Sequence, residues 1–233
     1  MYFCDLGFAV TAGANTPEGH TREEVNNSTA AAVRSIFLSF LPQKYVLDGT
    51  RKTNVNLGPA NGQHQYWQAC GVSTYYVEDF NFHTYFELSP ERRYDMLLDV
   101  LEASLLDIAS RFGADPTPIR QTIAATRECG GERRYTIPRL AKSTPSRKLK
   151  LNVFRHIGPE YEKWGIDVTD RKGDVLKTEW IVHRTNFTDA SYKFRKAVVE
   201  AGEFVLLGSL GEVTYRLKMH DLEQELINTT DRP

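Results

Sequence analysis

Cys70 and His20 are the residues that come closest to a nucleophile motif. The segment 68–71, Gln-Ala-Cys-Gly, nearly matches the QAC[RQG]G signature around the nucleophile of some cysteine proteases, and His20 lies fifty residues upstream. Such an enzyme needs a thiolate and an imidazole together at the carboxyl ends of parallel strands. Val72 replaces the final glycine of the signature, so we interpret Cys70 as a small buried thiol in a strand. A cryptic cysteine-dependent hydrolase that uses Cys70 with His20 or His64 stays open as an alternative.

Motifs for metal or nucleotide chemistry are missing from the sequence. The six histidines are scattered, and none forms HxxxH, HExxH or a short pair with cysteine. The nearest set for a site assembled from distant segments is His64, His83 and Asp79. The chain also lacks a GxxxxGK[ST] loop, a GxGxxG turn after a strand and a GxSxG elbow. We therefore predict no metal, no cofactor and no catalytic residues.

Four carboxylates share one face of a predicted helix. At about 100° per residue, Glu91, Asp95, Asp99 and Glu102 fall within about 80° of one another, beside the apolar face formed by residues 98–112. Like charges four residues apart cost a helix a few tenths of a kcal/mol each. Such a stripe suits docking to a basic protein, where it raises the association rate and the specificity. The alternative is a solvated face, or pairing with nearby arginines of the same chain.

Three further residues are predicted to bind the same partner. Tyr94 lies beside the stripe on the helical projection, and Glu78 and Asp79 lie within the aromatic segment 66–86 that precedes the helix. Protein interfaces draw most of their affinity from a few buried anchors, among which aromatic side chains are enriched. Tyr94, or the aromatic residues of the segment 75–86, are the candidate anchors.

A basic segment lies at 132–150. Its seven basic residues against one acid suit contacts with phosphate groups. The net charge of the chain is −1, however, and the segment fits no nucleic-acid-binding module. We interpret it as a charged edge that blocks strand-to-strand aggregation, and keep a nucleic-acid-associated accessory protein as an alternative. The basic residues are Arg133, Arg134, Arg139, Lys142, Arg147, Lys148 and Lys150.

Helices are predicted from caps and apolar periodicity. The best defined helix begins after Ser89, with Pro90 at its first position, and ends before Gly113. The other predicted helices span 21–41, 116–127 and 189–201.

Strands are predicted from alternation and from β-branched and aromatic residues. The clearest signal is a hairpin at 165–182, whose strands flank the turn Asp170-Arg171-Lys172-Gly173. The segment 54–65, rich in Gly, Asn and Gln, is predicted to be a long loop. Further strands are expected at 2–10, 66–86, 149–154, 204–207 and 213–217.

This order predicts an α+β fold with a mainly antiparallel sheet packed with about four helices. A parallel doubly wound sheet is disfavoured because strands and helices do not alternate regularly. We predict a single domain over 1–233, with a possible subdivision near 130–148.

The segment 78–115 resembles a pattern in uncharacterised bacterial proteins of the polymorphic-toxin immunity type. In both, an acidic and aromatic strand leads through a Ser-Pro cap into a Leu-rich helix that ends near Phe-Gly. The segment 159–180, with Trp164-Gly165 and a turn before a second tryptophan, is similar to their later hairpin. The resemblance covers about a quarter of the chain. It implies a non-enzymatic protein that blocks a cognate toxin by direct contact, and it carries over no residue's role.

Composition agrees with a cytoplasmic globular protein. Apolar residues make up 41% and charged residues 25% of the chain. The three cysteines, Cys4, Cys70 and Cys129, form no pairing pattern and are expected to stay reduced. No apolar run approaches the roughly 18 residues that span a bilayer, and the amino terminus lacks a secretory signal. Composition thus predicts no membrane partner, while the resemblance and the acidic stripe imply a basic toxin as the partner and make nucleic acid the less favoured alternative.

Overall fold

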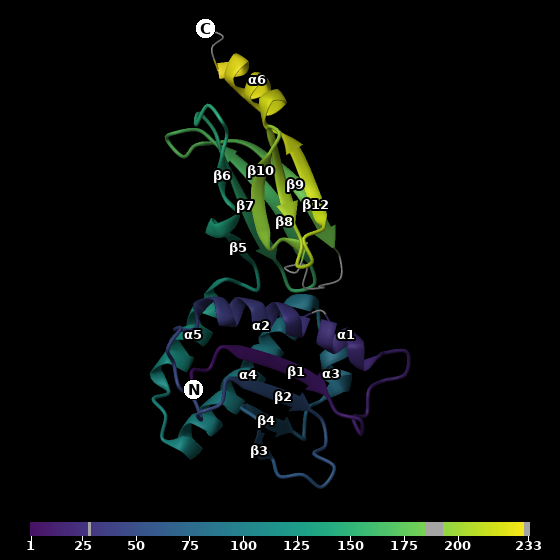
Figure 1. Ribbon diagram of the computed structural model, residues 1–233. Helices are drawn as coiled ribbons and strands as arrows, with labels where there is room; N and C mark the ends of the chain where they lie inside the picture. Colours follow the sequence, from purple (N-terminus) through teal and green to yellow (C-terminus); the bar gives the residue numbers. More distant parts are fainter. Residues whose placement is uncertain (28, 185–192, 231–233) are drawn as a thin grey trace. The chain divides into compact units, whose positions relative to one another are not determined.

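The computed structural model describes residues 1–27, 29–184 and 193–230 and divides the chain into two compact units (Figure 1). Within the described chain, unit 1 consists of 1–133 and 157–161, and unit 2 of 134–156, 162–184 and 193–230. The boundary at Arg133 falls inside the range 130–148, where the sequence allows a subdivision. The single domain over 1–233 stays a prediction. The α+β fold class is confirmed, with two antiparallel sheets and one mixed sheet in the described chain.

Unit 1 is built on a mixed four-stranded sheet in the order β1-β2-β4-β3. The strands β1 (Asp5–Val10), β2 (Lys52–Leu57) and β4 (Val72–Val77) are parallel, and β3 (Tyr66–Ala69) is antiparallel to β4. The sequence did not predict the parallel pairing of β1, β2 and β4, although the sheet is mixed and is not a doubly wound parallel sheet.

The predicted loop at 54–65 is also wrong in its first part, because β2 occupies it up to Leu57. Thr53, Val55 and Leu57 are buried on one face of β2, and Asn54 and Asn56 lie on the other. Asparagine is depleted in strands, so the two asparagines make this strand look like a loop by composition.

Helices α2 (Thr29–Phe40), α4 (Pro90–Phe112) and α5 (Thr117–Glu128) pack against one another in unit 1. The predicted helix at 21–41 is divided into α1 (Arg22–Asn27) and α2. The predicted strand region at 66–86 ends instead in helix α3 (Phe82–Glu87), which begins because the Asn81 side chain accepts a hydrogen bond from the Thr84 N–H at 3.0 Å. The core joins the sheet to the helices, and its members share complete burial: Leu6, Val55, Leu57, Val33, Ile36, Phe37, Leu98, Leu101 and Leu105.

Asp48, in the loop before β2, accepts a group of hydrogen bonds in unit 1. The Thr50 N–H and hydroxyl donate to its Oδ1 at 2.8 and 2.7 Å, and the Tyr66 hydroxyl donates to its Oδ2 at 2.8 Å. Burial would raise the pKa of Asp48, but these hydrogen bonds outweigh it and leave the pKa below its ordinary value.

The lowered pKa of Asp48 predicts a pH-dependent contribution to stability. The contribution is present above the unfolded-state pKa of about 3.9 and is lost as the pH falls through the folded-state pKa. We expect Asp48→Asn to lower the free energy of unfolding by about 1–2 kcal/mol at pH 7. The difference from the original chain should shrink between pH 5 and pH 3 in urea titrations. A difference that stays constant over this range would contradict the assignment.

Unit 2 contains two antiparallel sheets. One sheet has the order β5-β7-β8-β9, with β6 (Lys142–Ser143) also paired to β7, and the other has the order β10-β11-β12. The bounds are Arg133–Thr136 for β5, Lys150–Ile157 for β7, Glu162–Thr169 for β8, Val175–Arg184 for β9, Lys196–Glu200 for β10, Glu203–Leu207 for β11 and Val213–Lys218 for β12. The short 3₁₀ helix η1 (Pro138–Leu140) follows β5.

The hairpin prediction is confirmed, because β8 pairs antiparallel with β9 and Gly173 has a φ of 95° in the turn. The helix predicted at 189–201 is wrong in its described part, where β10 forms. Its proposed cap, Asp189, lies outside the described residues. Helix α6 (Met219–Thr230) was not predicted, and its Met219 and Leu222 are buried in the core of unit 2 with Trp164 and Phe204. No helix in the described ranges has the length and apolar character needed to cross a bilayer.

Candidate functional site

Helix α4 holds the predicted stripe and has well-formed ends. The Ser89 hydroxyl accepts a hydrogen bond from the Arg92 N–H at 3.4 Å, and Pro90 occupies the first turn, where its missing N–H costs nothing. Gly113 ends the helix in the left-handed conformation, with a φ of 65°. These caps fix which residues face the core and which face water.

The predicted stripe faces water. Glu91, Asp95 and Asp99 are exposed, and Glu102 is partly exposed. The pKa of Glu91 is lowered by hydrogen bonds at the start of the helix, from the backbone and from Ser89. Arg93 is the cation nearest in sequence to Asp95, and its guanidinium lies 3.4 Å from the Glu160 carboxylate instead.

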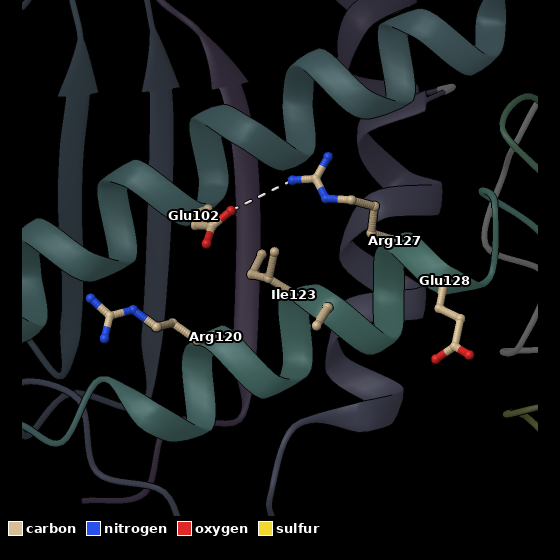
Figure 2. Close-up of a pocket in the computed structure, with 6 residues that line it drawn as sticks. Glu102, Arg120, Ile123, Arg127 and Glu128 are labelled. Atoms are coloured by element: carbon tan, nitrogen blue, oxygen red, sulfur yellow. Dashed lines mark ion pairs between the residues drawn. The ribbon is translucent and has the colours of Figure 1, made fainter.

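Arg127 of α5 pairs with the other half of the stripe, and Figure 2 shows its ion pair with Glu102. Its guanidinium lies 2.8 Å from the Asp99 carboxylate and 3.5 Å from that of Glu102. The prediction of an uncompensated stripe is therefore wrong at these two residues, for which the alternative of internal pairing holds. A pocket of about 410 Å³ lies here between α4 and α5, lined by Glu102, Arg120, Ile123, Ala124, Arg127 and Glu128.

Replacing Arg127 should change surface charge more than stability. Because the Asp99 and Arg127 side chains are both largely exposed, Arg127→Met should cost at most about 1 kcal/mol in urea unfolding. It would also free two carboxylates, which should speed association with a basic partner. Arg120→Met, in the same pocket and without an ion pair in the described chain, is the matched control. A loss above about 2 kcal/mol would give Arg127 a structural role instead.

Tyr94 is not available as an anchor. Its side chain is only 1% exposed, because on the helical projection it falls in the middle of the buried face, close to Leu98 and Leu101. A Cβ added at Gly131 would stand 3.4 Å from the Tyr94 ring, so the chain after α5 covers it closely. Burial raises the pKa of Tyr94. The prediction that Tyr94 contacts a partner is corrected by this burial.

Glu78 and Asp79 lie next to α4. Both are exposed at the carboxyl end of β4, and both line a pocket of about 410 Å³ together with Val100 and Ala103 of α4. On the helical projection, Ala103 follows Asp99 by about 40°. None of the four stripe residues lines this pocket, and Ala103 is the lining residue whose direction is nearest to the stripe. We call Glu78, Asp79, Glu91, Asp95, Asp99 and Glu102 the acidic surface.

The two units carry opposite net charges. Counted over the full sequence, including the residues outside the described ranges, unit 1 contains 17 acidic and 11 basic residues, and unit 2 contains 13 acidic and 18 basic residues, which gives −6 and +5. The net charge of −1 for the whole chain therefore hides an acidic unit and a basic unit. The acidic surface lies on the unit whose overall field favours a cationic partner.

Part of the basic segment at 132–150 is occupied by contacts within the chain. The Arg133 guanidinium lies 3.5 Å from the centre of the Phe40 ring, and that of Arg134 lies 2.6 Å from the Asp167 carboxylate. The exposed remainder includes Arg147, whose backbone carbonyl accepts a hydrogen bond from Arg171 at 3.2 Å. The protected edge strand β5 agrees with the interpretation of this segment as a charged sheet edge.

Cys70 and the two histidines of the alternative hydrolase lie at opposite ends of strand β4. Cys70 forms the turn between β3 and β4 at the amino end of β4, where it is exposed with a φ of 51°, so the prediction of a buried strand cysteine is wrong. His20 stacks on Phe86 with ring centroids 4.0 Å apart, beyond the carboxyl end of β4, and His64 precedes β3 at the same end. The length of β4 separates the thiol from both imidazoles, which contradicts either pairing.

The described residues contain no group of three or more histidine, cysteine or carboxylate side chains arranged to hold a metal ion. They do contain a crevice that the sequence reasoning missed, at the carboxyl ends of the parallel strands. It is lined in part by Asn15, Asn81 and His83. A polar loop follows each of β1, β2 and β4. These loops predict a site only when the strands are known to be parallel, because parallel strands bring the three loops to the same end of the sheet.

Comparisons of this chain with protein families, with curated proteins and with solved structures found no match.

Proposed function

We propose that this chain is a non-enzymatic binding protein of the immunity type, which neutralises a cognate toxin in the cytoplasm through the acidic surface of unit 1. The observation that carries the proposal is the pocket that joins Glu78 and Asp79 to the exposed side of α4. Its residue Ala103 lies about 40° from Asp99 on the helical projection, so the pocket places a second segment of the chain beside the stripe. Protein partners are recognised by surfaces of this kind, on which charge surrounds a hollow.

The pocket suits an arginine side chain of the partner. Tyr76 lines it beside the two carboxylates of Glu78 and Asp79, with the apolar side chain of Val100 on the α4 side. A guanidinium forms paired hydrogen bonds with carboxylates and stacks on aromatic rings, whereas the flexible ammonium of lysine does so less well. An inserted arginine would be the buried anchor, and the stripe would supply the charged rim around it.

The remaining charge of the acidic surface favours a basic toxin. Glu91 and Asp95 have no ion pair in the described chain, and Arg127 offsets only part of the charge of Asp99 and Glu102. Complementary charge steers a basic protein toward this face and raises the association rate at low salt. Nuclease toxins carry a basic substrate-binding surface, which an acidic protein would cover.

The product of the neighbouring open reading frame is the first bait for testing this function. The purified full chain should bind that product directly, with an affinity that falls as salt is raised from 50 to 500 mM, because screening weakens exposed charge pairs. If the neighbouring product is a toxin and the purified chain leaves both its activity and its mobility on a sizing column unchanged, the proposal fails.

A further inference from the structure

The parallel strands of unit 1 bring three loops to one edge of the sheet. Thr11–Asn15 follows β1, Gly58–Asn61 follows β2, and Glu78–Asn81 follows β4. Because β1, β2 and β4 run in the same direction, their carboxyl ends lie side by side. In proteins with parallel sheets, ligand sites are formed by the loops at this edge.

A crevice of about 320 Å³ lies among these loops. Its volume is at the lower end of the range for small-molecule sites. Phe80 and Phe82 contribute apolar surface, with their rings edge to face and 4.8 Å between centroids. The full lining is Gly13, Asn15, Gly58, Pro59, Glu78, Phe80, Asn81, Phe82 and His83, which includes one carboxylate and no lysine or arginine.

Thr11 does not line the crevice but lies behind its wall. The Thr11 side chain is only 9% exposed, and its hydroxyl has no hydrogen-bond partner among the described residues. A Cβ added at the lining residue Gly58 would stand 2.7 Å from this hydroxyl, so Thr11 lies directly behind the crevice wall. Gly58 has a φ of 103°, which favours glycine and lets the wall remain thin.

We propose that this crevice binds an uncharged nucleoside. The amide of Asn15 matches the adjacent donor and acceptor of an adenine edge, which asparagine recognises through two hydrogen bonds. The Glu78 carboxylate matches the two hydroxyls of a ribose, the role that an acidic residue fulfils in many parallel sheets. A phosphate group would find no cationic side chain in the lining and would meet Glu78, so the nucleotide is disfavoured.

Adenosine, 2′-deoxyadenosine and AMP test this site on the full-length chain. We expect adenosine to shift the backbone amide NMR signals of Gly13, Asn15 and His83. The affinity for AMP should be at least about tenfold lower because of charge repulsion, and that for 2′-deoxyadenosine several-fold lower because one hydroxyl is missing.

Variants outside the acidic surface separate this inference from the proposed function. Asn15→Ala and His83→Ala are exposed changes that should each weaken adenosine binding about tenfold, whereas His220→Ala in unit 2 should leave it unchanged. An absence of shifts at millimolar adenosine, AMP binding as tight as adenosine binding, or equal effects of His83→Ala and His220→Ala would each overturn the proposal. Because Asn15, His83 and His220 lie outside the acidic surface, these outcomes decide the nucleoside proposal without deciding the proposed function.

Discussion

Glu162→Ala is expected to lower the free energy of unfolding of unit 2 by about 3–5 kcal/mol. The Glu162 carboxylate is 0% exposed and lies 2.6 Å from Nε of Arg155, whose side chain is 9% exposed. It also accepts a hydrogen bond from the Trp164 indole N–H at 2.9 Å. Removing the carboxylate takes a hydrogen-bond acceptor from a buried guanidinium charge and from a buried indole N–H. Both groups have lost their contacts with water on burial, so the loss of the acceptor destabilises the fold strongly. Urea unfolding followed by tryptophan fluorescence measures it.

Two other variants make the Glu162 prediction specific. The Glu160 carboxylate lies 3.4 Å from the Arg93 guanidinium, and the Glu160 side chain is 39% exposed. Glu160→Ala should therefore lower the free energy of unfolding by less than about 1 kcal/mol. Glu162→Gln keeps an acceptor for the indole and should cost less than alanine at the same position. If Glu160→Ala and Glu162→Ala were equally destabilising, the buried network would have no special role.

Gly165→Ala should cost about 1–3 kcal/mol through overpacking. An added Cβ would stand 2.5 Å from Cζ of Phe154 and 2.7 Å from the backbone carbonyl oxygen of Glu179. Phe154 is 1% exposed and the carbonyl belongs to the partner strand β9, so neither atom can move aside cheaply. The midpoint of urea unfolding should fall, with little change in its slope.

A double mutant isolates the cause of the Gly165 effect. Phe154→Leu shortens the obstructing side chain, so Gly165→Ala should cost less in that background than in the original chain. Gly7→Ala is a suitable comparison, because the atom nearest its added Cβ is the end of the partly exposed Asn54 side chain. Strict additivity of Gly165→Ala and Phe154→Leu would show that the ring is not the obstacle.

The sequence predicts best where local chemistry decides the structure. Ser89, Pro90 and Gly113 fix the ends of α4, and Gly173 fixes the turn between β8 and β9, because caps and turns depend on a few adjacent residues. Prediction failed where tertiary pairing decides. The alternating residues of β2 become a strand between β1 and β4, and 196–200 becomes β10 because it pairs with β11.

The candidate site was predictable only in part for the same reason. Helical periodicity placed Glu91 and Asp95 at the surface, since it depends on one element alone. It could not show that Arg127 approaches Asp99, because that contact needs the packing of α5 on α4. The burial of Tyr94 was within reach of the projection, since its direction coincides with that of the buried leucines.

The affinity of a charge-reversed chain for its toxin partner tests the proposed function most directly. The variant Glu78→Lys/Asp79→Lys/Glu91→Lys/Asp95→Lys changes the exposed residues of the acidic surface that lack an ion pair in the described chain. The matched control, Asp174→Lys/Glu200→Lys/Glu212→Lys/Asp221→Lys, reverses four exposed charges in unit 2. At physiological salt, we predict that the fourfold variant binds at least about 100-fold more weakly, through slower association and faster dissociation, while the control binds within about threefold of the original chain. A fourfold variant that binds as tightly as the control would contradict the proposal.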